Sequence, residues 1–78
     1  MKMLKLNDYW IKILSKLPET GMGYQVGRVT LKNGRVLNRV VIIQSSLIGE
    51  AEGSKKIDFS NDEIEKIEVT HEKFSHRT

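Results

Sequence analysis

An Asn-Gly pair in the middle of the chain separates two segments rich in β-branched residues, and this pattern constrains the fold most strongly. The first segment is Gln25–Leu31 and the second is Arg35–Ile43. Asn-Gly is the dipeptide that best accommodates the positive φ angles of a two-residue hairpin turn. The sequence therefore predicts a β-hairpin over 25–44, with Asn33 and Gly34 at its turn.

Length and composition bound the class of protein. The 78 residues are expected to form a single domain, 1–78, with a modest core. The chain has no cysteine, which excludes disulfides and thiolate metal sites and makes a reducing cytoplasm the expected compartment. Small domains without such cross-links often gain stability by association, so a homo-oligomer is expected. The net charge of +3 permits an anionic partner without requiring one.

The chain shows no pattern for entry into a membrane. Its longest continuous apolar run, Val40–Ile43, is far shorter than the roughly 20 residues that span a bilayer. Asn7 and Asp8 interrupt the N-terminal segment before the apolar core of a signal peptide could form. We therefore expect a globular domain without membrane association.

The segment 3–17 has the periodicity of an amphipathic helix. Six apolar residues recur at helical spacing and form one stripe: Met3, Leu6, Trp10, Ile13, Leu14 and Leu17. Asn7 or Asp8 could instead cap a shorter helix, which would leave Met1–Leu6 as an extended arm. Pro18 ends the helix, because the residue before a proline is displaced from helical geometry.

The stripe has one structural and two functional interpretations. In the structural one, it covers an open end or face of a small sheet whose core would otherwise be unsealed. Alternatively, the stripe docks into a partner protein or lies on an anionic membrane surface. The residues that would form this partner or membrane face are Trp10, Ile13, Leu14 and Leu17.

The two arms of the hairpin indicate a curved sheet. The apolar residues of the first arm change phase at Gly27, which predicts a bulge or a sharp bend there. Bends of this kind let a short sheet curl into a barrel. The continuous apolar run 40–43 in the second arm indicates that both of its faces are covered. One face would meet the core, and the other the N-terminal helix or a neighbouring subunit.

Three shorter strands and one helical turn are predicted after the hairpin. The strands are expected at Ser46–Glu52, at Ile57–Phe59 and at about Lys66–His71. Ser60-Asn-Asp-Glu63 has the pattern of a capping box, which predicts one helical turn beginning at Asn61.

These elements combine into one predicted fold. Its class is α+β, mainly β: an N-terminal helix packed on a strongly bent, five-stranded antiparallel small barrel that spans about 24–71. The polar remainder, 72–78, is expected to be a frayed tail.

The hairpin carries a resemblance to a known family. Arg28-Val-Thr-Leu-Lys-Asn-Gly-Arg-Val-Leu-Asn-Arg-Val-Val41 resembles the first motif of the Sm-like family, and Ile57–Val69 is a looser echo of that family's closing strands. The resemblance implies a small bent barrel and RNA binding. The chain departs from the family at Gln44–Leu47, which lacks the acidic residue and the Asn of the nucleotide pocket, and at Glu63–Glu68, which lacks the second motif. It is equally similar to Src-homology-three-like barrels, which mostly bind proteins or serve as structural modules.

Four basic residues lie on or beside the hairpin: Arg28, Lys32, Arg35 and Arg39. With a two-residue turn, Lys32 pairs with Arg35 and Arg28 faces Arg39, which places like charges along one ribbon. Such a ribbon could follow the phosphates of RNA or DNA. In the other interpretation, these residues pair with acids or keep an edge strand soluble. The acids considered as partners are Glu50, Glu52, Asp58, Glu63, Glu65 and Glu68.

The residue types needed for catalysis or metal binding do not come together in the sequence. His71 and His76, with Glu72 between them, have a spacing unsuited to a metal site. No Ser or Thr has a nearby His with an orienting acid, so neither an enzyme nor a cofactor is expected. The predicted function is a non-catalytic binding or assembly module that self-associates through sheet edges, with another protein as a further partner. The alternative is an RNA-binding small barrel that uses the basic hairpin.

Overall fold

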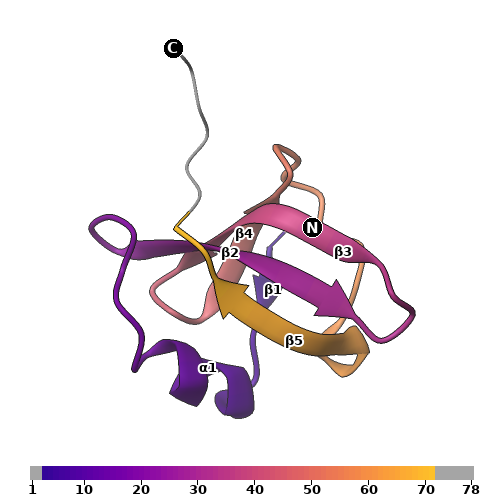
Figure 1. The fold of residues 1–78 in the computed structure, drawn as a ribbon, viewed down its shortest axis with the longest axis horizontal. Coiled ribbons are helices and arrows are strands. Elements are labelled where there is room, and N and C mark those ends of the chain that lie inside the picture. Colours follow the sequence, from indigo (N-terminus) through magenta and orange to yellow (C-terminus); the bar gives the residue numbers. More distant parts are fainter. Residues whose placement is uncertain (1–2, 72–78) are drawn as a thin grey trace.

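The computed structural model describes residues 3–71 of the chain. In this part of the chain, five antiparallel strands form one sheet that curls into a half-barrel, with one short α-helix packed against it (Figure 1). The strands follow the order β1-β4-β3-β2-β5 across the sheet. The elements are β1 (Leu4–Lys5), α1 (Asp8–Leu14), β2 (Tyr24–Leu31), β3 (Val36–Ile43), β4 (Leu47–Ala51), the 3₁₀ turn η1 (Asn61–Glu63) and β5 (Ile64–Val69). No helix within 3–71 has the length and apolar character needed to cross a bilayer.

The N-terminal helix is shorter than the predicted 3–17. It begins after Asn7, whose side-chain oxygen accepts a hydrogen bond from the Trp10 amide at 3.3 Å. Asn suits this position because it satisfies one of the free amides of the first helical turn. Leu4–Lys5 forms β1 and pairs with β4, so the extended arm with a capped, shorter helix is the alternative that the structure contains.

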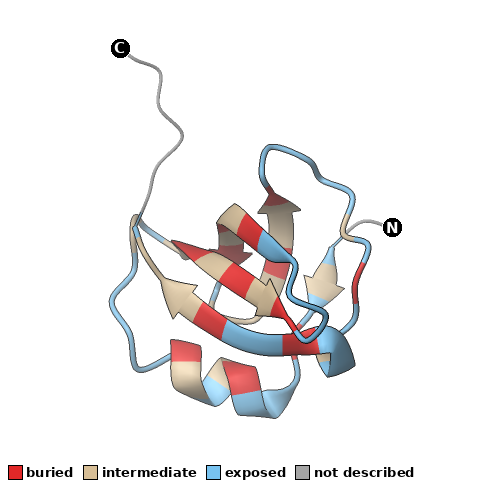
Figure 2. Ribbon diagram, turned by 45° about the vertical axis from the view of Figure 1, so that its right-hand side comes forward, coloured by how far each residue is buried: buried red, intermediate tan, exposed pale blue. Residues whose placement is uncertain are grey.

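The hydrophobic core lies between the inner face of the half-barrel and α1. In the second half of β2 and in β3 after its bulge, buried residues alternate with less buried ones, as expected for strands with one face toward a core (Figure 2). The helix contributes Trp10 and Leu14 to this core, and the N-terminal arm contributes Leu6. The remaining buried members are Val29, Leu31, Leu37, Val40, Ile42, Ile48, Ala51, Phe59, Ile64 and Ile67.

The predicted hairpin is confirmed, but its turn differs. The Leu31 amide donates to the Arg35 carbonyl at 2.8 Å, and the Gly34 amide donates to the Leu31 carbonyl at 2.9 Å. The loop therefore has three residues, and of its Asn-Gly pair only Gly34 has a positive φ, 94°. A type I turn closed by a left-handed glycine has this geometry. The predicted pairing of Lys32 with Arg35 is wrong, because Lys32 lies in the loop.

A bulge bends the hairpin beside Gly27, close to where the sequence predicted one. The register shifts between Gly27 and Val29, and at the shift Asn38 and Arg39 together oppose Arg28. The extra residue thus lies on β3, and Arg39 adopts a left-handed φ of 48°. Arg28 faces Arg39 as predicted, but it shares that position with Asn38.

Gly27 itself is needed for the close approach of β5. A Cβ built on Gly27 would overlap the carbonyl oxygen of Glu68 and lie 3.3 Å from Cα of Val69. Because both clashing atoms belong to the backbone, they could not move aside without shifting β5.

A buried polar residue causes the apparent change of phase in β2. Gln25 is fully buried, and its amide nitrogen donates to the carbonyls of Leu14 and Leu17 at 3.0 and 3.2 Å. These carbonyls lie at and just beyond the end of α1, where helical hydrogen bonds run out. Ser45 donates to the Gln25 side-chain oxygen at 3.4 Å. The inward-facing positions of β2 therefore recur at every second residue from Gln25 to Leu31. Val26 is also buried, but it does not belong to the core cluster.

The segment after β4 holds one strand fewer than predicted. Ile57–Phe59 forms no strand, although Phe59 is buried. Alternation places Ile57 and Phe59 on one side of the chain, but a strand also needs a partner, and no described strand pairs with this segment. The fifth strand of the sheet is β1 instead.

The capping box and the last strand are confirmed. The Glu63 carboxylate accepts a hydrogen bond from the Ser60 amide at 2.8 Å, and the predicted helical turn is η1. The last strand, β5, begins two residues before the predicted start and ends at Val69. The predicted frayed tail, 72–78, lies outside the described residues.

A side chain, and not a strand ladder, connects the two ends of the sheet. β1 and β5 are the first and last strands in the order. Asn61, which precedes β5, accepts a hydrogen bond from the Asn7 amide and donates one to the Lys5 carbonyl, both at 2.9 Å. Asn61 thereby fixes the N-terminal arm to the β5 end of the sheet.

Candidate functional site

Two of the four predicted nucleic-acid-binding residues are paired with acids. The Arg28 guanidinium lies 3.3 Å from Glu68, and its Nε donates to Asn38 at 3.1 Å. Arg35 contacts both carboxylate oxygens of Asp58 at 3.2 Å. Both acids are among the partners considered from the sequence, so these charges are partly neutralised within the chain.

Lys32 and Arg39 lie at different places on the hairpin. Arg39 is in the bulge of β3, whereas Lys32 is in the turn, where its amide donates to the Glu63 carbonyl at 2.8 Å. Lys32 also borders an open hollow together with Tyr9 and Trp10. The four residues therefore follow the hairpin from its bulge to its turn and do not converge on one point.

The predicted partner or membrane face of the helix is largely inside the protein. Trp10 and Leu14 are 8% and 0% exposed and belong to the core, and Ile13 packs partly buried against it. Of the four, Leu17 alone is exposed, and it lies beyond the end of α1. The prediction that these residues form a partner or membrane face is therefore corrected for Trp10, Ile13 and Leu14. They seal the open side of the sheet, as in the structural interpretation of the stripe.

The structure brings together a Thr and a His that the sequence separates by 51 positions. Thr20 Oγ1 lies 2.7 Å from His71 Nδ1 and accepts a hydrogen bond from the Val26 amide at 2.9 Å. The His71 amide donates to the Val26 carbonyl at 2.8 Å. A hydroxyl beside an imidazole is part of a nucleophile–base arrangement, but such an arrangement also needs a group that orients the ring. The Thr20–His71 hydrogen bond joins the loop before β2 to the chain that follows β5.

The described residues contain no cluster suited to a metal ion. No three His, Cys, Asp or Glu side chains gather at one point within 3–71. Glu72 and His76, which the sequence places near His71, lie outside that range.

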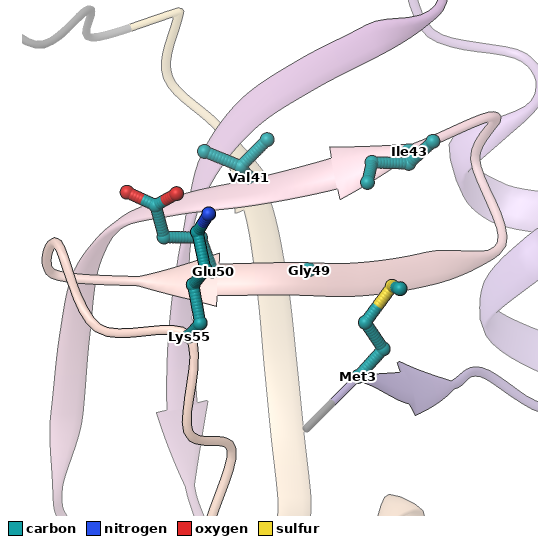
Figure 3. A pocket seen from close by; sticks show the side chains of 6 residues that line it. All are labelled: Met3, Val41, Ile43, Gly49, Glu50 and Lys55. Carbon is teal, nitrogen blue, oxygen red and sulfur yellow. The ribbon is translucent and has the colours of Figure 1, made fainter. Parts of the chain in front are cut away.

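An apolar hollow of about 390 Å³ lies on the outer face of β3 and β4 (Figure 3). Its floor is Gly49, the extra residue of a bulge in β4. A Cβ built on Gly49 would lie 2.8 Å from Cδ1 of Ile43 and 3.9 Å from Sδ of Met3. Val41 forms a further part of the wall. The missing side chain at Gly49 therefore leaves space between the apolar side chains on either side.

One acid and one base stand at one end of this hollow. They are Glu50 in β4 and Lys55 in the loop that follows, and both line the hollow (Figure 3). Within the described residues, neither side chain forms an ion pair or a hydrogen bond, whereas Arg28, Arg35 and Lys66 all have acidic partners. The sequence predicted that both faces of 40–43 are covered. In the structure α1 covers the inner face only, and the outer wall of the hollow is half-buried.

Comparison with protein-family models, with curated proteins and with solved structures finds no match for this chain. We therefore infer a function from the geometry of the sheet and its surfaces.

Proposed function

We propose that the protein is a non-catalytic assembly module that self-associates through the edges of its sheet, with another protein as a further partner. The observation that supports this most is the outer edge of β5. One side of β5 pairs with β2, while the other side forms no backbone hydrogen bond with any described residue. An unpaired strand edge is a template on which a strand of another molecule can pair.

Within the described residues, the opposite edge of the sheet is also incomplete. β1 pairs with β4 only at Leu47 and Ile48, so β4 extends beyond the residues that β1 covers. A chain with two different incomplete edges can join its copies head to tail, either as a closed ring or as an open chain.

A relationship to the Sm-like or Src-homology-three-like small barrels is part of this proposal. Its support is the meander β2-β3-β4, the helical turn before β5 and the return of β5 to pair with β2. A non-catalytic role fits the surroundings of the His71 ring, which no acidic side chain among residues 3–71 contacts. The cysteine-free sequence favours a reducing cytoplasm as its location.

The edge can be tested at Val69. Because the Thr70 amide donates to the Val26 carbonyl in β2, alternation along the strand directs the Val69 amide away from β2. Val69→Pro removes this outward donor, and Val69→Ala is the matched control that keeps it. By light scattering after size exclusion, we expect wild type and Val69→Ala to assemble and Val69→Pro to have a smaller mass than either. Circular dichroism verifies that all three are folded, and assembly of Val69→Pro at wild-type strength would contradict the proposal.

A second candidate function is the binding of single-stranded RNA. The observation in its favour is that the fold places Tyr9, which is 65% exposed, and Trp10 beside Lys32 around one hollow. Aromatic side chains next to basic ones are the usual means of binding single strands, since bases stack on the rings. Asp62 and Glu65 border the same hollow and oppose phosphate binding there.

Fluorescence anisotropy with a labelled oligouridine decides on this candidate. If RNA is a ligand, Tyr9→Ala should weaken binding at all salt concentrations, because it removes stacking. The double variant Arg35→Glu/Arg39→Glu should abolish most binding and flatten its salt dependence. A wild-type protein that binds no oligouridine at low salt removes the candidate.

A further inference from the structure

We infer that the hollow formed by Met3, Val41, Ile43 and Gly49, with Glu50 and Lys55 at its end, is a two-fold contact surface for a second copy of this chain. The inference rests on the proposed self-association and adds to the edge contact a separate, face-to-face contact. Two features support this contact: the charges at the hollow and the shape of its apolar part.

The charges make this surface complementary to itself. In a two-fold contact, residue i of one copy meets residue j of the other, and residue j of the first meets residue i of the second. A surface that carries one acid and one base at the same hollow can therefore form two equivalent ion pairs. Glu50 of each copy would pair with Lys55 of the other. Both side chains are uncommitted within the described residues, whereas the bases at Arg28, Arg35 and Lys66 are paired.

The apolar part of the surface has an exposed side chain, Met3, and a hollow that can receive the Met3 of a second copy. Met3 is 56% exposed, and its sulfur lies 3.9 Å from the position of a Cβ on Gly49, at the margin of the hollow. Unbranched, flexible Met side chains fill irregular gaps well. A two-fold contact would let Met3 of each copy enter the hollow of the other and would bury the half-exposed sides of Val41 and Ile43.

A nucleic acid or another strongly anionic ligand fits this surface less well. Glu50 would repel phosphates, and Lys55 is the only base that lines the hollow among residues 3–71. A second copy uses both charges and the apolar wall together, which is why we favour it over an anionic partner.

Charge exchange provides the test, using the full chain. Glu50→Lys and Lys55→Glu each place like charges opposite one another in the two-fold contact, and each should raise the dissociation constant by about tenfold or more. An equimolar mixture of the two variants should recover association, because every contact then joins opposite charges. The double variant Glu50→Lys/Lys55→Glu should associate like wild type. Sedimentation velocity over a range of concentrations measures all four samples.

Recovery in the mixture supports the inference and also shows that both single variants are folded. Charge variants that associate like wild type overturn the inference. If the charge variants associate like wild type while Val69→Pro associates more weakly, the edge proposal stands and only the inference of a face contact is rejected. If the charge variants dissociate and Val69→Pro does not, the face contact stands and the edge proposal fails. A monomeric wild type overturns both.

Discussion

The two faces of β3 have nearly the same composition and very different surroundings. Val40 and Ile42 point inward and are fully buried, whereas Val41 and Ile43 point outward and are half-buried at the hollow. On the inner face the strand meets α1 and the neighbouring strands, while on the outer face Met3 of the arm and Lys55 of the loop after β4 border an open hollow. Hydrophobicity alone therefore does not determine burial in this sheet. An apolar outer face that the described chain leaves open is a typical contact surface.

The largest expected effect separates two neighbouring isoleucines. Ile42→Ala should lower the free energy of unfolding by about 4 kcal/mol, because it leaves a cavity in the core. Ile43→Ala should lower it by only about 1 kcal/mol, since much of its side chain already meets solvent. Urea denaturation of the two variants at a concentration where the wild type is monomeric measures both. Equal losses would remove the distinction between the two faces.

Gln25 tests whether the inner face depends on a polar contact. Gln25→Leu should lower the free energy of unfolding by about 2 kcal/mol, because the carbonyls of Leu14 and Leu17 no longer accept hydrogen bonds from the Gln25 amide. Gln25→Glu keeps the shape, replaces the donor by a carboxylate facing carbonyls, and should lower it further. Thermal denaturation ranks the two variants. A Gln25→Leu protein as stable as wild type would mean that these carbonyls find other partners.

The N-terminal arm contributes to both faces, with Leu6 inside and Met3 outside, and Asn61 holds it. Asn61→Ala removes the hydrogen bonds to Asn7 and Lys5 and should lower the free energy of unfolding by about 1 kcal/mol. Faster hydrogen exchange of the Leu6 amide, which bonds to the Ser46 carbonyl, would report release of the arm. Unchanged exchange at Leu6 would show that β1 stays in place without Asn61.

The smallest effect is expected on the polar part of the outer surface. Arg35 and Asp58 are 47% and 59% exposed, so the pair is well solvated. Arg35→Gln should change the free energy of unfolding by less than about 0.5 kcal/mol, because exposed ion pairs contribute little. A loss above about 1 kcal/mol in chemical denaturation would indicate that this pair is structurally important after all.

Local patterns in the sequence predicted the elements whose causes are local. The Asn-Gly pair, the β-branched arms and the capping box each depend on neighbouring residues, and the hairpin and η1 formed as expected. β1 could not be predicted from a local pattern, because a strand of two residues forms only when it pairs with β4. Ile57–Phe59 has the alternation of a strand but lacks a partner.

The features of the candidate site depend on contacts between distant residues, so the sequence could not specify them. The apolar residues of the first arm were predicted to change phase at Gly27, because the partners that let Gln25 face inward lie at the end of α1. Thr20 and His71 meet only once β5 returns to β2. The run 40–43 predicted that both faces of β3 are covered, whereas the described chain leaves the outer face half-buried and the bulge at Gly49 hollows it.

The native mass of the full chain in solution tests the central claim most directly. Light scattering after size exclusion, repeated over increasing concentration at moderate salt, should show a mass that rises to two or more chains. Val69→Pro and Glu50→Lys measured beside it separate the edge contact from the face contact. A mass of one chain at every concentration would contradict the account of this protein as a self-associating module.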